Sequence, residues 1–428
     1  MKNLFILFLS LISLNISAQP WVSATPFPDP NEYVNCILKY NGELYIGGEF
    51  TQVGGLVASK VAKWSGTNWS TLGSGLNYTV NDLIEYNGDI YAATTWGIYK
   101  WDGNSWSTEL TTGGSFPDNY NSLCLFNGQI AASSTGIVLG SNTSWVNLGS
   151  NVVGSPTALC VYNGDLYYGS SCGSSCSLPT GYSTIAKWDG ATWIDVAGVT
   201  VYEPNIYALT VYNNKLIAGG DFQSMGGFTI SHMAAYDGVN WSSVGDWPTI
   251  NSEVSALSTL NNKLYAGSYV GKWSGSNWQK VLVLNGNQWD GLGDSNTIYS
   301  NSGNIESVFD ILDYNNELFV AGNLKAGLQN QPYHFIKLDG YSVVGIDELN
   351  LASYIEVYPN PTNSTINISL EEATNVKVTI RNSLGQRVMQ DAFKNSITVK
   401  LDLDIPAGLY FLEIEANGNI ITKKLIKQ

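Results

Sequence analysis

The chain has 428 residues, with 35 Asp or Glu against 20 Lys or Arg, so its formal net charge is −15. Nucleic-acid binding needs a basic surface that displaces counterions from phosphates, and this acidic chain, whose only arginines are Arg381 and Arg387, predicts none. With two His and five Cys it also shows no cluster of metal ligands and no cofactor motif, so we expect neither a metal nor a cofactor.

Residues 1–18 have the composition of a signal peptide. Lys2 gives a basic start, residues 4–14 form an apolar run too short to span a bilayer, and Ser17 and Ala18 are small residues suited to cleavage. We therefore expect export across the inner membrane. No other stretch has the roughly 20 apolar residues of a transmembrane helix.

Residues 19–345 contain a sevenfold repeat. Each copy has an aromatic residue or Leu followed by Asn-Gly or Asn-Asn, with the first Asn at positions 41, 87, 127, 163, 213, 261 and 315. Such a pair between apolar alternations predicts a hairpin, because a type I′ turn needs positive φ at both central residues. Leu or Ile stands four residues before and three residues after every one of these Asn, which predicts a core between neighbouring sheets.

A second hairpin follows in each repeat. Lys63-Trp64-Ser65-Gly66 precedes Trp69, for example, and six related copies occur. Two hairpins make one four-stranded blade, so the sequence predicts an all-β, seven-bladed β-propeller. Six or eight blades are alternatives, because Asn285-Gly286 with Trp289 looks like a further hairpin inserted in the sixth repeat. Trp21-Val22-Ser23 competes with residues 341–344 to complete the last blade.

The repeat resembles the kelch pattern, in which a double Gly after the second strand is followed by an aromatic residue and then Trp. Gly47-Gly48 and Gly219-Gly220 carry that pair, whereas the other five copies lack it. The resemblance implies a fold, not an activity.

Aromatic side chains are the candidates for ligand contacts. A Trp at the same point of nearly every repeat predicts packing between blades. The residues that we interpret as breaking this register, and as candidate ligand contacts, are Trp96, Trp247, Trp289, Tyr120 and Tyr182.

Cys172 and Cys176 lie in a polar insertion, Cys172-Gly173-Ser174-Ser175-Cys176. A short-loop disulfide and two free thiols are both compatible with this spacing in an exported chain. The other three cysteines fall at or near one repeated strand position, which predicts buried small side chains.

After a linker at residues 346–354, residues 355–428 read as a small β-sandwich. Residues 376–380, 397–401 and 410–414 alternate apolar and polar side chains, with turns at Gly385 and Gly408. Several motifs occur in order. They are Tyr358-Pro359-Asn360-Pro361, Asn382-Ser383-Leu384-Gly385-Gln386, Gly408-Leu409-Tyr410-Phe411 and the closing Lys423-Lys424.

These motifs resemble the type A C-terminal sorting domain of the type IX secretion system. The resemblance implies recognition by the outer-membrane translocon and its tail-processing machinery, and location at the cell surface or outside the cell.

Three functions remain open. The first is a secreted or surface-held binding module for a neutral glycan or a protein. The second is a glycoside hydrolase with two carboxylates contributed by different blades, a pair that sequence spacing cannot reveal. The third is a structural or adhesive surface protein without a small-molecule ligand. Residues 19–349 hold no arginine to read a sialic acid carboxylate, and two His leave no margin for a galactose-oxidase-type copper site. We therefore name no catalytic residue and expect binding.

Overall fold

The computed structural model describes residues 21–23, 29–111, 119–141, 144–149, 152, 154–171, 184–198, 205–247, 253–274, 277–292, 307–326, 331–342, 356–358, 360, 362–382, 387–416 and 419–428. All regular elements among them are β-strands. The chain divides into two compact units, Met1–Val343 and Val344–Gln428. The expected signal peptide and linker lie outside the described residues.

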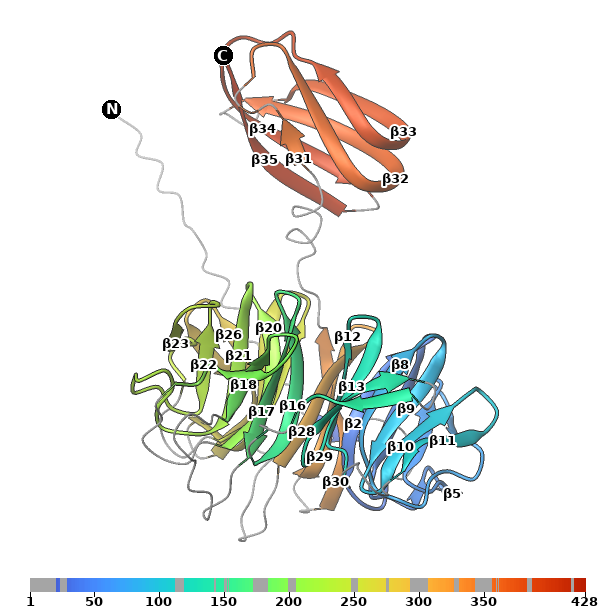
Figure 1. Ribbon diagram of the computed structural model, residues 1–428. Helices are drawn as coiled ribbons and strands as arrows, with labels where there is room; N and C mark the ends of the chain where they lie inside the picture. Colours follow the sequence, from blue (N-terminus) through green and yellow to red (C-terminus); the bar gives the residue numbers. More distant parts are fainter. Residues whose placement is uncertain are drawn as a thin grey trace, which may run out of the picture. The chain divides into compact units, whose positions relative to one another are not determined.

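Within the described residues, the first unit holds seven antiparallel four-stranded sheets (Figure 1). Sheet one is β2 (Val34–Tyr40), β3 (Glu43–Gly48), β6 (Val61–Trp64) and β7 (Trp69–Thr71), with a small hairpin of β4 (Gln52–Val53) and β5 (Leu56–Val57) between β3 and β6. Sheet two is β8 (Val80–Tyr86), β9 (Asp89–Thr94), β10 (Gly97–Trp101) and β11 (Trp106–Thr111). Sheet three is β12 (Ser122–Phe126), β13 (Gln129–Ser133), β14 (Ile137–Ser141) and β15 (Ser144–Asn147).

The remaining sheets repeat this order. Sheet four is β16 (Ser155–Tyr162), β17 (Asp165–Ser171), β18 (Ile185–Trp188) and β19 (Trp193–Asp195), and sheet five is β20 (Asn205–Tyr212), β21 (Lys215–Asp221), β22 (Met233–Tyr236) and β23 (Trp241–Ser243). Sheet six is β24 (Val254–Leu260), β25 (Lys263–Ser274), β26 (Asn277–Asn285) and β27 (Gln288–Gly291). Sheet seven is β28 (Ser307–Tyr314), β29 (Glu317–Ala326), β30 (Gln331–Ser342) and β1 (Trp21–Ser23).

The first strands of these sheets bring neighbouring sheets together. Each first strand contacts the first strand of the next sheet along the chain, and β28 contacts β2. The sheets therefore close into a propeller-like ring. In the last sheet, β1 pairs with β30, Trp21 lying opposite Leu338, so the N-terminal strand supplies the fourth strand of that sheet.

The turns follow the repeated Asn as predicted. Both central residues have positive φ at all seven positions, from Asn41 (51°) and Gly42 (76°) to Asn315 (50°) and Asn316 (64°). Twelve of the fourteen repeated Leu and Ile side chains are buried, and Leu209 and Leu257 are partly buried. The predicted hairpins and core are therefore confirmed.

The sixth sheet corrects one interpretation. The hairpin at Gly286 joins β26 to β27, its third and fourth strands, and is not an insertion. The Trp273 and Trp278 pair instead lies in the far part of the β25–β26 hairpin, beyond a register shift. Trp289 thus occupies the repeated place on the outer strand, the place that Trp241 occupies in sheet five.

Bulges in the first strands direct polar side chains at the next sheet. Six of the seven first strands contain one register shift, which is a β-bulge. A bulge changes the direction in which a side chain points. Asn35 Nδ2 donates to the carbonyl of Val80 at 2.9 Å, and Ser255 Oγ donates to that of Val308 at 2.7 Å. These bonds join consecutive sheets near the centre of the ring.

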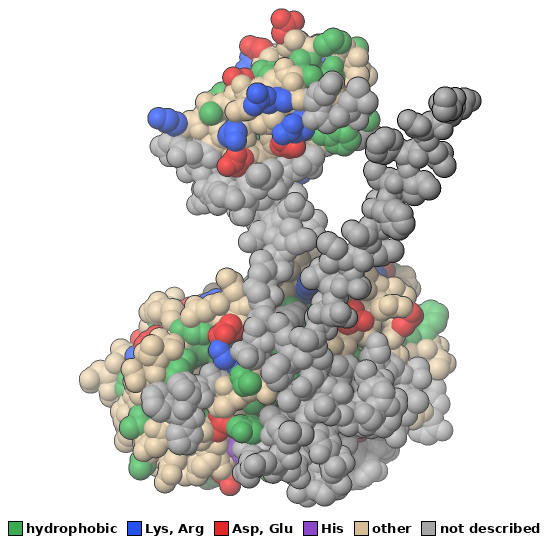
Figure 2. Space-filling view, turned by 180° about the vertical axis from the view of Figure 1, so that it is seen from behind, with side chains coloured by type: hydrophobic (Ala, Val, Ile, Leu, Met, Phe, Trp, Pro, Cys, Tyr) green, Lys and Arg blue, Asp and Glu red, His purple; other side chains and the backbone are tan. Residues whose placement is uncertain are grey.

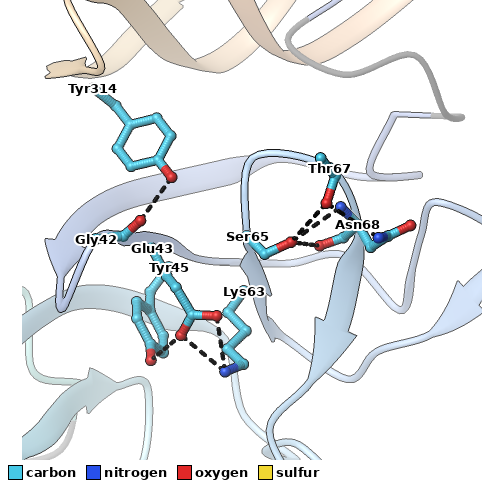
Figure 3. Close-up of polar contacts among 8 residues, drawn as sticks. All are labelled: Gly42, Glu43, Tyr45, Lys63, Ser65, Thr67, Asn68 and Tyr314. Carbon is cyan, nitrogen blue, oxygen red and sulfur yellow. Dashed lines mark hydrogen bonds and ion pairs between the residues drawn. The ribbon is translucent and has the colours of Figure 1, made fainter.

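Two further sets of hydrogen bonds join the sheets. Tyr hydroxyls before the hairpin turns donate to a carbonyl in the next turn, and Tyr314 reaches Gly42 in this way at 2.7 Å, across the ring closure (Figure 3). Farther out, five Trp indoles donate to the carbonyl at the exit of the previous sheet's outer strand. They are Trp21 to Leu292, Trp106 to Leu72, Trp193 to Leu148, Trp241 to Val196 and Trp289 to Val244. The repeated Trp therefore pack between sheets, as predicted.

The second unit is one five-stranded sheet. Its strands are β31 (Glu356–Tyr358), β32 (Thr365–Asn382), β33 (Arg387–Asp402), β34 (Gly408–Ala416) and β35 (Asn419–Lys427). They pair in the order β31-β32-β34-β35, and β33 pairs with β32. Ile368, Val378, Val399 and Leu412 belong to a single buried core.

Candidate functional site

Three of the five aromatic residues selected from the sequence are buried and do not offer a face to a ligand. Trp247 and Trp289 are buried and meet edge to face, with ring centroids 5.0 Å apart, inside a core of sheets five and six. Tyr120 is fully buried in the core of sheets two and three. Tyr182 lies outside the described residues, as do Cys172 and Cys176. Trp96 is the exception.

Trp96 is 44% exposed and heads a row of three aromatic rings on sheet two. Its ring stacks on Tyr78, with centroids 5.7 Å apart and planes 17° apart, and Tyr78 in turn stacks on Tyr99 at 6.3 Å and 28°. We call Trp96, Tyr78 and Tyr99 the aromatic platform. Partial burial raises the pKa of the Tyr99 hydroxyl.

The turn that carries Trp96 is held in place by the Thr94 hydroxyl and by a backbone bond to the segment before β8. The buried Thr94 hydroxyl donates to the Gly97 carbonyl at 2.9 Å and accepts from the amides of Trp96 and Gly97 at 3.2 and 3.1 Å. The Thr95 amide donates to the Thr79 carbonyl at 3.1 Å, which ties this turn to the segment bearing Tyr78. The platform is therefore preorganised, which lowers the entropy lost when a ligand binds.

A pocket of about 420 Å³ lies between sheets one and two. It is lined by Tyr40 and Asn41 from sheet one, and by Trp101 and Asn104 from sheet two, among others. Gly88, in the β8–β9 turn, also lines it, whereas Trp96 lies in the β9–β10 turn at the opposite end of β9. The pocket and the aromatic platform are thus different places on sheet two.

An ion pair neutralises the one basic group of this pocket. Lys63 Nζ lies 2.9 and 3.1 Å from the two carboxylate oxygens of Glu43, and the Tyr45 hydroxyl donates to Glu43 at 3.3 Å (Figure 3). Burial and the Glu43 charge raise the pKa of Tyr45 to about 12. The same pairing recurs in sheets two, four and seven as Lys100 with Asp89, Lys187 with Asp165 and Lys337 with Glu317. This pair is therefore part of the repeat.

Two inner-strand carboxyls have strongly raised pKa values. Burial raises the pKa of Asp82 to about 7 and that of Asp310 to about 6. Asp82 accepts the amides of Leu83 (2.8 Å) and of Leu123 in sheet three (2.7 Å). Asp310 likewise accepts those of Ile311 (2.8 Å) and of Ile37 in sheet one (2.7 Å). Each carboxyl thus joins two sheets by hydrogen bonds, which gives a structural reason for a buried carboxyl in the inner strand.

These two carboxyls predict a specific pH dependence. In the folded chain their pKa values exceed the ordinary value of 3.8, so between about pH 4 and pH 7 the folded state binds more protons than the unfolded state. The free energy of unfolding should therefore fall as pH rises through this window. Urea unfolding at several pH values should show a smaller fall for Asp82→Asn than for the wild type. Equal slopes would contradict the assignment.

The three cysteine thiols in the described part of the chain are not activated. Burial raises the pKa values of the Cys36, Cys124 and Cys160 thiols, so they are poor nucleophiles. Within the described residues, no three His, Cys, Asp or Glu side chains gather as metal ligands do. Nor does this part of the chain contain a helix long and apolar enough to cross a membrane.

Within the second unit, the first sorting motif is hydrogen-bonded to the end of the last strand, β35. Asn360 Oδ1 accepts the Ile426 amide at 2.9 Å, the Thr362 amide donates to the Ile426 carbonyl at 2.9 Å, and the Gln428 amide donates to the Thr362 carbonyl at 2.8 Å. Tyr410 is buried and donates to the Pro406 carbonyl at 2.9 Å, near Gly408. Lys423 and Lys424 lie on β35, and Tyr358 is 47% exposed at the end of β31. Pro359, Pro361 and Gly385 lie outside the described residues.

The fold defines an all-β protein with a propeller-like ring and a separate C-terminal sheet. Residues 356–428 match the family described as the secretion system C-terminal sorting domain, which confirms the resemblance of the tail. This match supports secretion by the type IX system to the cell surface or the extracellular space, with its machinery as partner. The kelch resemblance is not shown. No curated protein matches the chain.

Solved structures resemble the chain weakly. The N-terminal part of BBS1 in complex with ARL6 aligns with a TM-score of 0.47 and 13% identity over 76% of this chain and 99% of that one. The computationally designed protein Ika8 aligns at 0.44 and 13% over 95% and 99%, and a putative gluconolactonase at 0.38 and 10% over 76% and 100%. Similarity at this level carries no argument about function.

The sequence did not indicate most of the residues of the aromatic platform or of the pocket between sheets one and two. Tyr78 lies outside the repeated strands, Tyr99 stands where sheets one and five have Ala62 and Ala234, and the sequence indicated Trp96 alone. Trp101 belongs to the repeated Trp series and was assigned to packing, although it also lines the pocket. A residue that recurs in every sheet can be exposed at one junction and buried at another. The sequence does not indicate at which junction it is exposed.

Proposed function

We propose that this chain is a binding module, secreted by the type IX system or held at the cell surface, that recognises a neutral glycan. The ring of sheets serves as a seven-bladed β-propeller, and the tail as a small sandwich that is the sorting domain. The aromatic platform is the observation that carries the proposal. The exposed part of the Trp96 ring, beyond its contact with Tyr78, can stack on the apolar C–H face of a pyranose, as aromatic faces do on apolar surfaces.

The polar groups beside the platform suit the same ligand. Asn81 Nδ2 donates to the Tyr120 carbonyl at 2.8 Å and to Asn119 Oδ1 at 3.3 Å, and the Tyr120 amide donates to the Thr94 carbonyl next to Thr95. These bonds use both Nδ2 hydrogens of Asn81, so the exposed amide of Asn119 is the group here that can donate to a sugar hydroxyl. On the face shown in Figure 2, uncharged side chains cover most of the described surface of the ring, with single acidic and basic side chains among them.

We predict that Trp96→Ala, which removes the exposed ring of the aromatic platform, weakens glycan binding. The chain from residue 19 to residue 428 should bind selected neutral glycans on an array, and Trp96→Ala should weaken that binding at least about tenfold, as expected for the loss of a stacking partner. Phe228→Ala is the matched control, because Phe228 is an aromatic residue that is 55% exposed at the tip of a loop of sheet five. Glycan binding that Trp96→Ala leaves unchanged would remove the platform from the proposal.

The other two functions are weaker. A hydrolase would be favoured by two raised-pKa carboxyls free to face a substrate, whereas Asp82 and Asp310 are bonded to backbone amides of adjacent sheets. Cleavage of an array glycan would nevertheless revive it. Silence across the array would favour a protein ligand or a structural surface role.

A further inference from the structure

The pocket between sheets one and two has the chemistry of a site for a single sugar residue. Its volume of about 420 Å³ falls within the range of about 300–1,000 Å³ that is usual for small-molecule sites. Two aromatic side chains, Tyr40 and Trp101, line it and are only partly buried, so both retain exposed ring surface.

Amide groups supply the polar part of this lining. Asn41 and Asn104 are exposed, and no hydrogen bond within the described residues engages either side chain. Each amide can therefore donate to and accept from a ligand hydroxyl. Tyr40 donates to the Gly88 carbonyl at 2.8 Å, which fixes its ring and leaves the phenolic oxygen able to accept.

Glycines keep the pocket open. A Cβ added at Gly73, which has a φ of +59°, would come within 3.2 Å of the Trp101 ring. A side chain there would therefore crowd the aromatic surface as well as strain the backbone. Gly88 and Gly103, both with positive φ, contribute backbone without side chains to the same lining.

The charge of the pocket selects a neutral ligand. Lys63 is the basic residue in the lining, and Glu43 holds its ammonium at 2.9 Å, so neither a carboxylate nor a phosphate would find a free cation here. Partly exposed aromatic rings, free amides and a neutral balance are the features that a polyhydroxylated ring requires.

We infer that this pocket binds one residue of a neutral saccharide, as a site separate from the aromatic platform. Trp96 and the pocket residue Gly88 lie at opposite ends of β9, so one ligand ring that stacks on Trp96 cannot also fill the pocket. A chain with two sites on one sheet gains avidity for a polymeric glycan without any new contact. This inference does not depend on the platform binding glycan.

A variant that fills the pocket tests the inference. Thr71 lines the pocket from the exposed edge of β7, so Thr71→Trp should occupy the space without disturbing the core. The matched control is Ser243→Trp. Ser243 holds the same place in sheet five, opposite Ala234 as Thr71 is opposite Ala62, and it does not line this pocket.

The probes are the neutral disaccharides cellobiose, maltose, chitobiose and mannobiose, at millimolar concentration, observed by saturation-transfer NMR on the chain from residue 19 to residue 428. We expect at least one to bind, Thr71→Trp in a Trp96→Ala background to weaken that binding at least about tenfold, and Ser243→Trp in the same background to leave it unchanged. Binding lost in Trp96→Ala but kept in Thr71→Trp would overturn the inference and leave the proposed function standing.

Two other outcomes separate the proposals further. Absence of binding by all four disaccharides would overturn the pocket, whatever the glycan array shows. Disaccharide binding that Thr71→Trp abolishes, in a chain whose array signal does not depend on Trp96, would support the pocket while the platform fails.

Discussion

Removal of residues 358–428 should leave the ring of sheets folded but confine it to the periplasm. The first unit has its own cores and closes through β1 and β30, so it does not need the second unit for its packing. The tail carries the match to the sorting domain, so the truncated chain lacks the domain that the translocon should recognise. The expected effect on secretion is therefore near complete.

Immunoblots of periplasm, cell surface and medium, in a host with a type IX secretion system, would measure this effect. Lys394→Ala, on the tail strand β33 but outside the sorting motifs, is a control that should be exported like the wild type. Tryptophan fluorescence would show that the truncated ring is folded, because all 14 Trp lie before residue 290. Truncated protein in the medium would refute the sorting role.

The hydrogen bonds of Asn360 explain why the first sorting motif lies beside the end of the chain. Asn360 and Thr362 bind Ile426 and Gln428, and Asn360 and Ile426 are 66 residues apart in sequence, so the first motif and the end of the chain form one local structure. The sequence presented them as separate motifs. Their pairing depends on a strand register that is set by the whole sheet.

The repeat could be predicted from the sequence because its signals are local. Asn-Gly and Asn-Asn demand positive φ whatever surrounds them, and the Leu and Ile at fixed distances alternate with the strand period. Such features are decided within a few residues of each turn. The sequence also linked the repeated Trp to packing, which the indole hydrogen bonds between sheets bear out.

The candidate site was harder to predict because it depends on contacts between repeats. Trp96 was selected for breaking the register, but its exposure depends on Tyr78 in the connection before β8. The pocket lies at the junction of sheets one and two, and its lining includes residues such as Trp101 that follow the common pattern. In the sixth repeat the long β25–β26 hairpin displaced the pattern, so Trp289 was mistaken for a residue outside it.

Replacement of Trp289 by Ala should destabilise the first unit by about 3–5 kcal/mol. Trp289 is 1% exposed and packs edge to face on Trp247 at 5.0 Å. Its indole also donates to the Val244 carbonyl of sheet five at 2.8 Å, so the truncation opens a cavity and removes a bond between sheets. Urea unfolding followed by tryptophan fluorescence would measure the change.

Trp96→Ala is the control for this measurement, because surface substitutions usually change the free energy of unfolding by less than about 0.5 kcal/mol. The two Trp residues were selected together from the sequence, and the structure gives them opposite roles. Trp289→Ala should lower stability, and Trp96→Ala should lower glycan binding without lowering stability. Unchanged stability of Trp289→Ala, with glycan binding lost, would return Trp289 to the ligand site and contradict its place between sheets.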